Sequence, residues 1–330
     1  MALPPLSVDA RIGPFVLVDE IGTGESSRVY RAHYRPEEGE RHDVGLPYGE
    51  SVVLKVLRED LDHSLERLNA FTREAELLVM LDHPGLTRPV TRGTTGSRVW
   101  LALEYIEGES FSALLDAFTH ARLRMKPQVV LTLMADLCDV VASIHGLADL
   151  RGRSLGLVHR NLSPRSVLLD IRGRPRVIDF SCAFLSARDR ASDVVVGTPG
   201  YLPPEQARLE PVGPSADVYA LGLLMFELLT SQRAYPVESL PASLMLQTHG
   251  RGARLGWPDH IEISGRLRAI VDQALHEDPS MRPPDARALQ QLLVPLVKDE
   301  ERSRHALRVV ARDLVNSVPP PPVTAEHAFL

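Results

Sequence analysis

Lysine, cysteine and long apolar runs are all scarce in this sequence of 330 residues. A membrane-spanning helix needs about 18 or more consecutive apolar residues, and no such run exists, so we expect no transmembrane helix. The first residues lack the basic region and apolar core of a secretory signal, and none is predicted. The two cysteines, Cys138 and Cys182, have no metal-binding spacing. A reduced, cytoplasmic setting is therefore expected.

An excess of positive charge is missing as well. The formal net charge is -6, so no global positive field attracts nucleic acid or a membrane surface, and neither is expected as a partner. The basic residues are almost all arginine, because only Lys55, Lys126 and Lys298 are lysines. The length suits one large two-lobed domain or two domains of average size.

The chain up to about residue 107 has the pattern of a β-sheet with one helix. Apolar residues alternate around the Gly22-Thr23-Gly24 turn, which indicates a β-hairpin. A stretch with helical spacing stops at His83-Pro84-Gly85. The predicted elements are a hairpin over 14–35, a strand over 51–57, a helix over 64–81 and two strands near 86–91 and 97–105.

The remainder of the chain is predicted to be mostly helical. The expected helices begin near 108–117 and continue as an amphipathic helix over 128–147, a buried helix near 216–230 and helices near 264–276 and 285–297. Residues 298–318 are charged, with Leu307, Val310 and Leu314 on one helical face, and Pro319 to Pro322 impose an extended segment. We expect this end of the chain to be a solvated helix and linker rather than a docking motif.

Two motifs lie between apolar strands in the second half of the chain. LVHRNLSPRSVLL spans Leu157 to Leu169, and RPRVIDFS spans Arg174 to Ser181. Together they resemble the catalytic loop H-R-D-L-K-P-x-N and the metal-binding D-F-G motif of eukaryotic-type (Hanks-type) Ser/Thr protein kinases. The resemblance covers most of the chain and implies an α+β, bilobal fold. It divides the chain into a lead-in (1–13), a small β-rich N-lobe (14–107), a larger mainly α-helical C-lobe (108–297) and a tail (298–330).

The same resemblance implies that the chain binds ATP and Mg²⁺. Glycines at the hairpin turn let backbone amides approach phosphate oxygens, although Ser27 replaces the third glycine of the family's loop. Lys55 is expected to hold the α- and β-phosphates and to pair with Glu74 on the following helix. Val53 stands where the family usually has alanine, and its extra methyl groups narrow the adenine pocket. The implied nucleotide contacts are Gly22, Gly24, Val29, Val53, Lys55, Glu74, Glu104, Ile106 and Leu168, with Leu103 as gatekeeper, Glu109 near the ribose and Asp179 on Mg²⁺.

Other matches to the family concern architecture. The buried support of the site is assigned to His159, Phe180, Leu78 and Asp217. Glu205 is expected to form a buried salt bridge with Arg282, and Thr198 occupies the place typical of Ser/Thr-directed kinases.

The catalytic loop departs from the family at several positions. Asn161 stands where the family has its catalytic aspartate, and an amide cannot act as a base. Ser163 replaces a lysine, and Ser166 replaces the asparagine that reaches a second Mg²⁺. Arg165 lies four residues after Asn161 and restores some positive charge but no base. Ser181 replaces the glycine of D-F-G.

These departures lead us to expect a pseudokinase that binds other signalling proteins or an active kinase and retains weak ATP binding. A low-activity Ser/Thr kinase is the alternative, because phosphoryl transfer depends mainly on positioning and electrostatics. A purely structural module with an empty pocket is the third hypothesis, which Val53 favours.

Overall fold

The computed structural model describes residues 6–24, 26–37, 44–58, 65–186, 195–235, 244–245, 248, 256–258 and 261–317. The chain forms two compact units. Among the described residues, the first unit contains the chain up to Met80 together with Thr87–Ile106, and the second contains Leu81–Leu86 together with residues 107–317. The predicted Pro319 to Pro322 segment lies outside the described residues.

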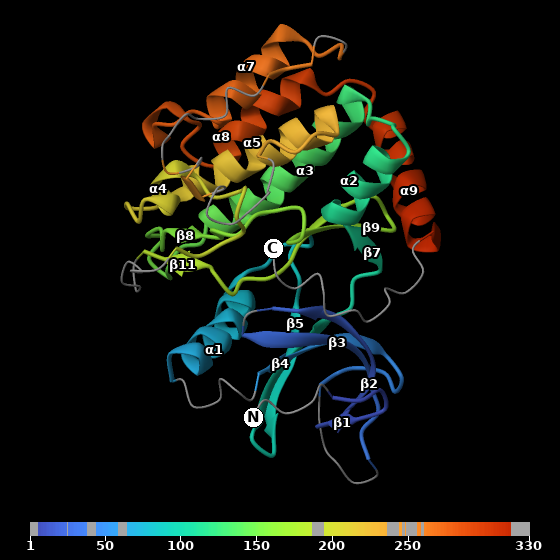
Figure 1. Ribbon diagram of the computed structural model, residues 1–330. Coiled ribbons are helices and arrows are strands. Elements are labelled where there is room, and N and C mark those ends of the chain that lie inside the picture. Colours follow the sequence, from blue (N-terminus) through green and yellow to red (C-terminus); the bar gives the residue numbers. More distant parts are fainter. Residues whose placement is uncertain are drawn as a thin grey trace. The chain divides into compact units, whose positions relative to one another are not determined.

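The first unit is an antiparallel sheet of six strands with one helix (Figure 1). The strand order is β1-β2-β3-β4-β6-β5. The strands are β1 (Arg11–Ile12), β2 (Phe15–Thr23), β3 (Ser27–Tyr34), β4 (Ser51–Leu57), β5 (Pro89–Thr95) and β6 (Arg98–Glu104). The strand predicted near 86–91 was placed too early, because Leu86 forms a bridge with Val177 in the second unit and β5 begins at Pro89.

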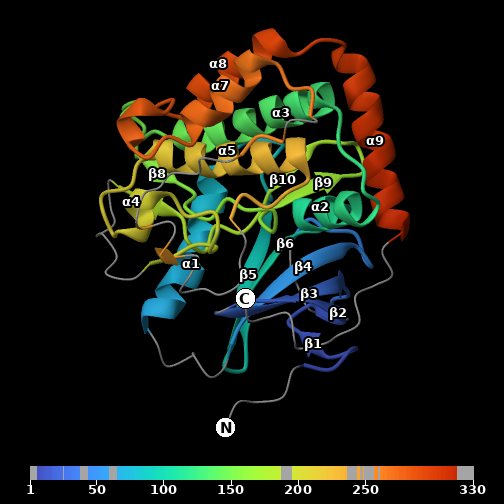
Figure 2. The same cartoon turned by 45° about the horizontal axis from the view of Figure 1, so that its top comes forward.

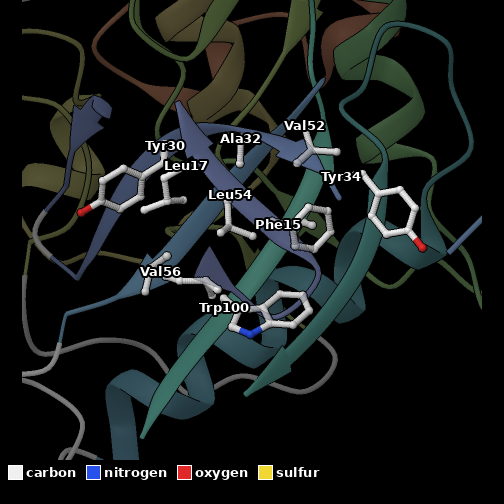
Figure 3. Packing of buried hydrophobic residues seen from close by; sticks show 11 residues of the cluster. Phe15, Leu17, Tyr30, Ala32, Tyr34, Val52, Leu54, Val56 and Trp100 are labelled. Atoms are coloured by element: carbon white, nitrogen blue, oxygen red, sulfur yellow. The ribbon is translucent and has the colours of Figure 1, made fainter. Parts of the chain in front are cut away.

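Alternation of side chains gives this sheet a largely apolar face (Figure 3). In strands, every second side chain points to the same face. On this face Phe15 packs edge-on against Trp100, with ring centroids 5.6 Å apart. The buried members of the cluster are Ile12, Phe15, Leu17, Tyr30, Ala32, Tyr34, Val52, Leu54, Val56, Trp100 and Ala102. Leu6 and Ala10, from the expected lead-in, pack against the same cluster.

Helix α1 (Leu65–Met80) begins and ends within one residue of its predicted bounds. It contacts the face of the sheet opposite the apolar cluster. Lys55 points away from the apolar cluster because its neighbours Leu54 and Val56 belong to it. Its ammonium group contacts Glu74 of α1. The alternation in β4 therefore separates an apolar face from a face that carries a charged group.

The second unit is mainly helical, as predicted. Its helices are α2 (Phe111–His120), α3 (Pro127–His145), α4 (Pro204–Ala207), α5 (Pro214–Thr230), α7 (Gly265–Ala274), α8 (Ala286–Leu293) and α9 (Glu300–Ser317), with 3₁₀ turns at Pro279–Met281 and Val294–Leu296. Ser110, Ser264 and Asp285 cap α2, α7 and α8 by accepting a hydrogen bond from a backbone N–H three residues later. Pro127 and Pro214 occupy the first position of α3 and α5, where a missing N–H costs nothing.

Helix α3 was predicted as an amphipathic helix over 128–147. Its apolar residues from Val129 on are buried, whereas Gln128, Asp136, Asp139 and Ser143 on one side are only partly buried. Its neighbours are α5, α8, α9 and strand β10 (Figure 2). Among the described residues it is the one helix long and apolar enough to cross a membrane, but 72% of that window is buried inside the protein. Core helices of globular domains have the same composition, so this finding is weak evidence for a membrane span.

A small sheet in this unit connects the two sequence motifs. Its strand order is β10-β9-β7, with β7 (Gly108–Ser110), β9 (Val167–Asp170) and β10 (Pro175–Val177). Strand β9 begins directly after Ser166, and β10 ends two residues before Asp179. A second pair joins β8 (Leu157–Val158) to β11 (Phe184–Leu185). The β9–β10 hairpin therefore fixes the distance between the loop at 159–166 and the Asp179 turn.

Helix α9 is docked on the second unit, so the prediction of a solvated helix was wrong. It packs beside α3, β7 and α2 (Figure 1). Leu307, Ala311 and Leu314 are buried, whereas Val310 is only partly buried. The Arg304 guanidinium donates to both carboxylate oxygens of Asp136 on α3. These contacts give the apolar stripe and one charged residue of α9 a partner that the sequence pattern did not reveal.

The β9–β10 turn shows how close this docking is. Gly173 has a φ of 74°, and a Cβ placed there would lie 2.8 Å from the backbone nitrogen of Arg308. Only glycine suits both the left-handed backbone and this approach. Helix α9 thus braces the hairpin that carries both motifs.

We expect Leu307→Ala to lower the free energy of unfolding by about 2–5 kcal/mol, because it removes a fully buried side chain and leaves a cavity. The matched control is Val309→Ala on the exposed side of the same helix, where Val309 is 44% exposed and a change within about 0.5 kcal/mol is expected. Urea-induced unfolding followed by circular dichroism measures both. Equal effects of the two variants would show that α9 is not anchored through this face.

Candidate functional site

The residues predicted to contact nucleotide in the first unit lie in one cross-strand row. The register pairs Gly22 with Val29, Val29 with Lys55 and Lys55 with Leu101. Directly paired residues of neighbouring strands project to the same face. A parallel row places Val53 next to Leu103, the predicted gatekeeper. The sheet therefore brings Gly22, Val29, Val53 and Lys55 together, as the resemblance implied.

The predicted hairpin is present, with Gly22 and Thr23 at the end of β2, where they pair with Val29 and Arg28. The Gly24 N–H donates to the Ser27 carbonyl over 2.8 Å. Ser27, which replaces the family's third glycine, is buried at the start of β3. Its side chain thus fits within the hairpin and does not disrupt the turn.

The predicted ion pair between Lys55 and Glu74 is confirmed. The Lys55 Nζ lies 2.7 Å from Oε1 and 2.8 Å from Oε2 of Glu74. Lys55 is 7% and Glu74 2% exposed. A charged pair at this depth is maintained only when each partner satisfies the other, because an isolated buried charge is strongly unfavourable.

The end of β6 carries the predicted hinge residues. The Glu104 N–H donates to the Arg88 carbonyl, and the Glu104 carboxylate accepts from the Arg88 backbone and guanidinium. Ile106 is buried and ends the Thr87–Ile106 segment of the first unit. The contact of Glu104 and Ile106 with adenine stays a prediction. In the second unit, Leu168 pairs with Ser110, and burial raises the pKa of Glu109 above its usual value.

The catalytic-loop segment is anchored by the buried Asp217 carboxylate of α5. Its Oδ2 accepts from the His159 N–H over 2.8 Å, and its Oδ1 accepts from the Arg160 N–H over 2.9 Å. His145 of α3 also contacts Oδ2 through Nε2 at 2.9 Å. Burial alone would raise the pKa of Asp217, but the hydrogen bonds from the His145 side chain and the His159 N–H outweigh it, so this pKa is lowered. The carboxylate therefore stays ionised as the acceptor for the loop.

Two residues of the site have a left-handed backbone. Arg160 has a φ of 61° and Asp179 a φ of 64°. Non-glycine residues in this region cost about 1–3 kcal/mol and are retained where the surroundings enforce them. His159 and Phe180, the neighbours of these residues, meet edge to face with ring centroids 4.9 Å apart. The predicted support by His159, Phe180 and Asp217 is thus present in the second unit.

Asn161 lies between two side chains that the sequence separates widely. Its Oδ1 accepts a hydrogen bond of 2.7 Å from the Thr198 hydroxyl. Its Nδ2 lies 3.5 Å from Asp179 Oδ2, to which it donates. The position of the family's base is therefore occupied by an amide whose two ends are both engaged.

Ser163 and Ser166 are turned into the loop. The Ser166 hydroxyl accepts from the Ser163 N–H over 2.9 Å and donates to the Asn161 carbonyl over 2.7 Å. Ser163 is 1% and Ser166 3% exposed. The Ser166 hydroxyl therefore stabilises the turn itself, whereas the Ser163 hydroxyl accepts from the Thr198 hydroxyl over 3.4 Å. Arg165 between them is exposed.

Gln206 is a residue that the sequence analysis missed. Its Nε2 donates to the Arg160 carbonyl over 2.8 Å and to the Val196 carbonyl over 2.7 Å. It thereby ties the loop to the segment that leads to Thr198. An exposed glutamine after Pro-Pro-Glu would look the same in the sequence, so no local signal identifies this role.

The predicted salt bridge of Glu205 with Arg282 is confirmed. Nη1 and Nη2 of Arg282 lie 2.7 and 2.9 Å from the two Glu205 carboxylate oxygens. The same guanidinium donates to the carbonyls of Ser215, Glu277 and His276. The planar fork thus has five acceptors, a geometry that lysine cannot reproduce.

The donor set of the second unit suits one Mg²⁺ ion. Mg²⁺ is commonly held by one or two carboxylates together with phosphate oxygens and water, and Asp179 offers a partly exposed carboxylate. Within the described residues, no group of three or more metal-ligating side chains exists. The Ser166 hydroxyl is used by the loop, so it does not supply a second metal position.

Comparison with known proteins yields a match across most of the chain. The family model described as "Protein kinase domain" matches residues 15–294. The chain is 32% identical over 292 residues to "Serine/threonine-protein kinase pkn2" of Myxococcus xanthus, which covers 85% of this chain and 32% of the relative. It is 30% identical over 285 residues to "Tyrosine-protein kinase MasK" of Myxococcus xanthus (strain DK1622), covering 85% and 42%. It is 29% identical over 289 residues to "Serine/threonine-protein kinase PknB" of Mycobacterium leprae (strain TN), covering 86% and 42%. The chain thus spans less than half the length of these relatives.

We expect Arg282→Lys to destabilise the protein by about 1–3 kcal/mol, because lysine keeps the charge but lacks the fork and leaves buried acceptors unsatisfied. Arg287→Lys is the matched control, since Arg287 pairs with Asp139 while 52% of its side chain is exposed, and such pairs contribute about 0–1 kcal/mol. Thermal unfolding of both variants checks the difference. Similar losses would contradict a special role for the Arg282 fork.

Proposed function

We propose that this chain, which belongs to the protein kinase family and is related to bacterial Ser/Thr kinases, is a pseudokinase. It binds Mg-ATP weakly, transfers phosphate inefficiently or not at all, and acts through partner proteins. The partners are other signalling proteins or an active kinase, and the setting is the cytoplasm.

The hydrogen bonding of Asn161 carries this proposal. A kinase needs an acceptor there for the proton of the substrate hydroxyl. The Asn161 amide is not a base, and its oxygen already accepts from Thr198. Loss of a general base typically slows a reaction by about 10²–10⁴-fold.

The serines of the loop support the same conclusion. The Ser166 hydroxyl is hydrogen-bonded to the backbone of Ser163 and Asn161. A second metal ion would therefore lack the amide oxygen that the family supplies at this position. Ser163 brings no cation to the transferring phosphoryl group. These losses act on one transition state and are not additive, but all of them reduce turnover.

Nucleotide binding is supported by what is retained. The Lys55–Glu74 pair is formed, the hairpin keeps Gly22 and Gly24, and Asp179 supplies a carboxylate of the kind that binds Mg²⁺. The bound ion would neutralise phosphate charge, while Lys55 would supply the cation for the α- and β-phosphates. Val53 narrows the adenine side and favours weak affinity.

A low-activity Ser/Thr kinase is the second candidate. The observation in its favour is the intact Lys55–Glu74 pair, which positions phosphates in active kinases. Phosphoryl transfer has a loose transition state that depends mainly on positioning and electrostatics, so a missing base reduces the rate without abolishing it.

For nucleotide binding, we expect millimolar Mg-ATP to raise the melting temperature of the unmodified chain, because a ligand that binds only the folded state stabilises it. The shift should vanish in Lys55→Ala and persist in Lys298→Ala, which removes an exposed lysine. Thermal-shift titration makes the comparison. Identical shifts in the unmodified chain and Lys55→Ala would rule out this nucleotide site.

For catalysis, we expect no transfer of radiolabelled phosphate from ATP above the level of Lys55→Ala. Combined Asn161→Asp and Ser166→Asn should raise the rate by about 10²-fold or more if nucleotide binds, because they restore a base and a metal ligand. Lys55-dependent multiple turnover by the unmodified chain would replace the pseudokinase proposal with the low-activity kinase.

A further inference from the structure

We propose that Asn161 is a positioning residue that holds the Asp179 carboxylate in place in the metal-free protein, a role that aspartate at this position could not perform. The inference rests on the proposed function only in taking Asp179 as the Mg²⁺ ligand. It concerns what Asn161 contributes, beyond the loss of a base.

The orientation of the Asn161 amide is fixed by its two neighbours. Oδ1 accepts from the Thr198 hydroxyl at 2.7 Å, and Nδ2 faces Asp179 Oδ2 at 3.5 Å. An amide has a donor end and an acceptor end. The reversed orientation would set its oxygen against the Asp179 carboxylate, so only the observed one lets both neighbours bond.

Both hydrogen-bond partners of the Asn161 amide are held in place by the fold. Thr198 reaches Asn161 from a segment that Gln206 ties to the Arg160 carbonyl. Asp179 has a left-handed backbone, with φ of 64°, and its Oδ1 accepts from the Ser181 N–H at 3.4 Å. A strained backbone of this kind persists only while its surroundings stabilise it. The Asn161 amide is one of those stabilising contacts.

Aspartate at position 161 would keep the bond from Thr198, because a carboxylate oxygen accepts equally well. It would replace the Nδ2 donor with an oxygen facing Asp179 Oδ2. Two carboxylates at such a distance repel each other unless a proton or a cation lies between them. Asparagine thus removes a repulsion that a cation would otherwise have to offset in this loop.

The experiment compares melting temperatures of the unmodified chain, Asn161→Asp, Asp179→Asn and the double variant, in EDTA and in millimolar MgCl₂ without nucleotide. Asn161→Asp should lower the melting temperature by about 2–4 °C in EDTA. Mg²⁺ should recover most of this loss, because the ion compensates two facing carboxylates. The double variant exchanges donor and acceptor, so it should melt close to Asp179→Asn alone.

Gln206→Glu is the matched control. It also places a new carboxylate near the loop, where the Gln206 amide donates to two carbonyls, but no second carboxylate faces that amide in the described contacts. It should lower the melting temperature without recovery by Mg²⁺ and without relief by Asp179→Asn.

A loss in Asn161→Asp that neither Mg²⁺ nor Asp179→Asn relieves would overturn the proposal, as would the absence of any loss in EDTA. These results are independent of turnover. Phosphate transfer by the unmodified chain would refute the pseudokinase while leaving the coupling between positions 161 and 179 intact.

Discussion

The buried carboxylate of Asp217 is the interaction on which the second unit depends. It accepts hydrogen bonds from the backbone N–H groups of His159 and Arg160 and from Nε2 of His145. The other ring nitrogen of His145 accepts from the Ala286 N–H at the start of α8. One carboxylate therefore joins helices α3, α5 and α8 to the loop. Its bonds fix the loop backbone, including the left-handed Arg160, whichever side chains the loop presents.

Because backbone support and side-chain chemistry are separate, some family motifs can be kept in this chain while the catalytic loop is altered. The pairs Lys55–Glu74 and Glu205–Arg282 are buried and bidentate, so loss of either partner would leave an isolated buried charge. The side chains at 161, 163 and 166 form no buried ion pair. The amide of Asn161 and the hydroxyl of Ser163 bond to Thr198, and the hydroxyl of Ser166 bonds to the loop backbone, so the loop keeps its shape without these charges.

Helix α9 extends the second unit beyond the segment that matches the family, which ends at residue 294. It contacts the β9–β10 turn at Gly173 and binds Asp136 through Arg304. The hairpin it braces connects the loop to Asp179. A change at the end of the chain therefore has a direct structural route to the candidate site.

The sequence by itself determined the element order, the Lys55–Glu74 and Glu205–Arg282 pairs and the altered loop. Periodicity reports which face of an element is apolar, and the family motifs carry their spacing with them. It also located most helix bounds to within a few residues, because capping residues and prolines mark them locally.

Only the tertiary structure decided what the polar side chains do. The bonds of Asn161 to Thr198 and Asp179 join residues far apart in sequence, and the bonds of Gln206 depend on two carbonyls with no side-chain signal. The docking of α9 was missed for a related reason. A helix with one apolar stripe and many charges has the same sequence pattern whether it is solvated or packed, because the stripe does not identify the surface that it contacts. Long-range complementarity of shape and hydrogen bonding exists only once the chain has folded.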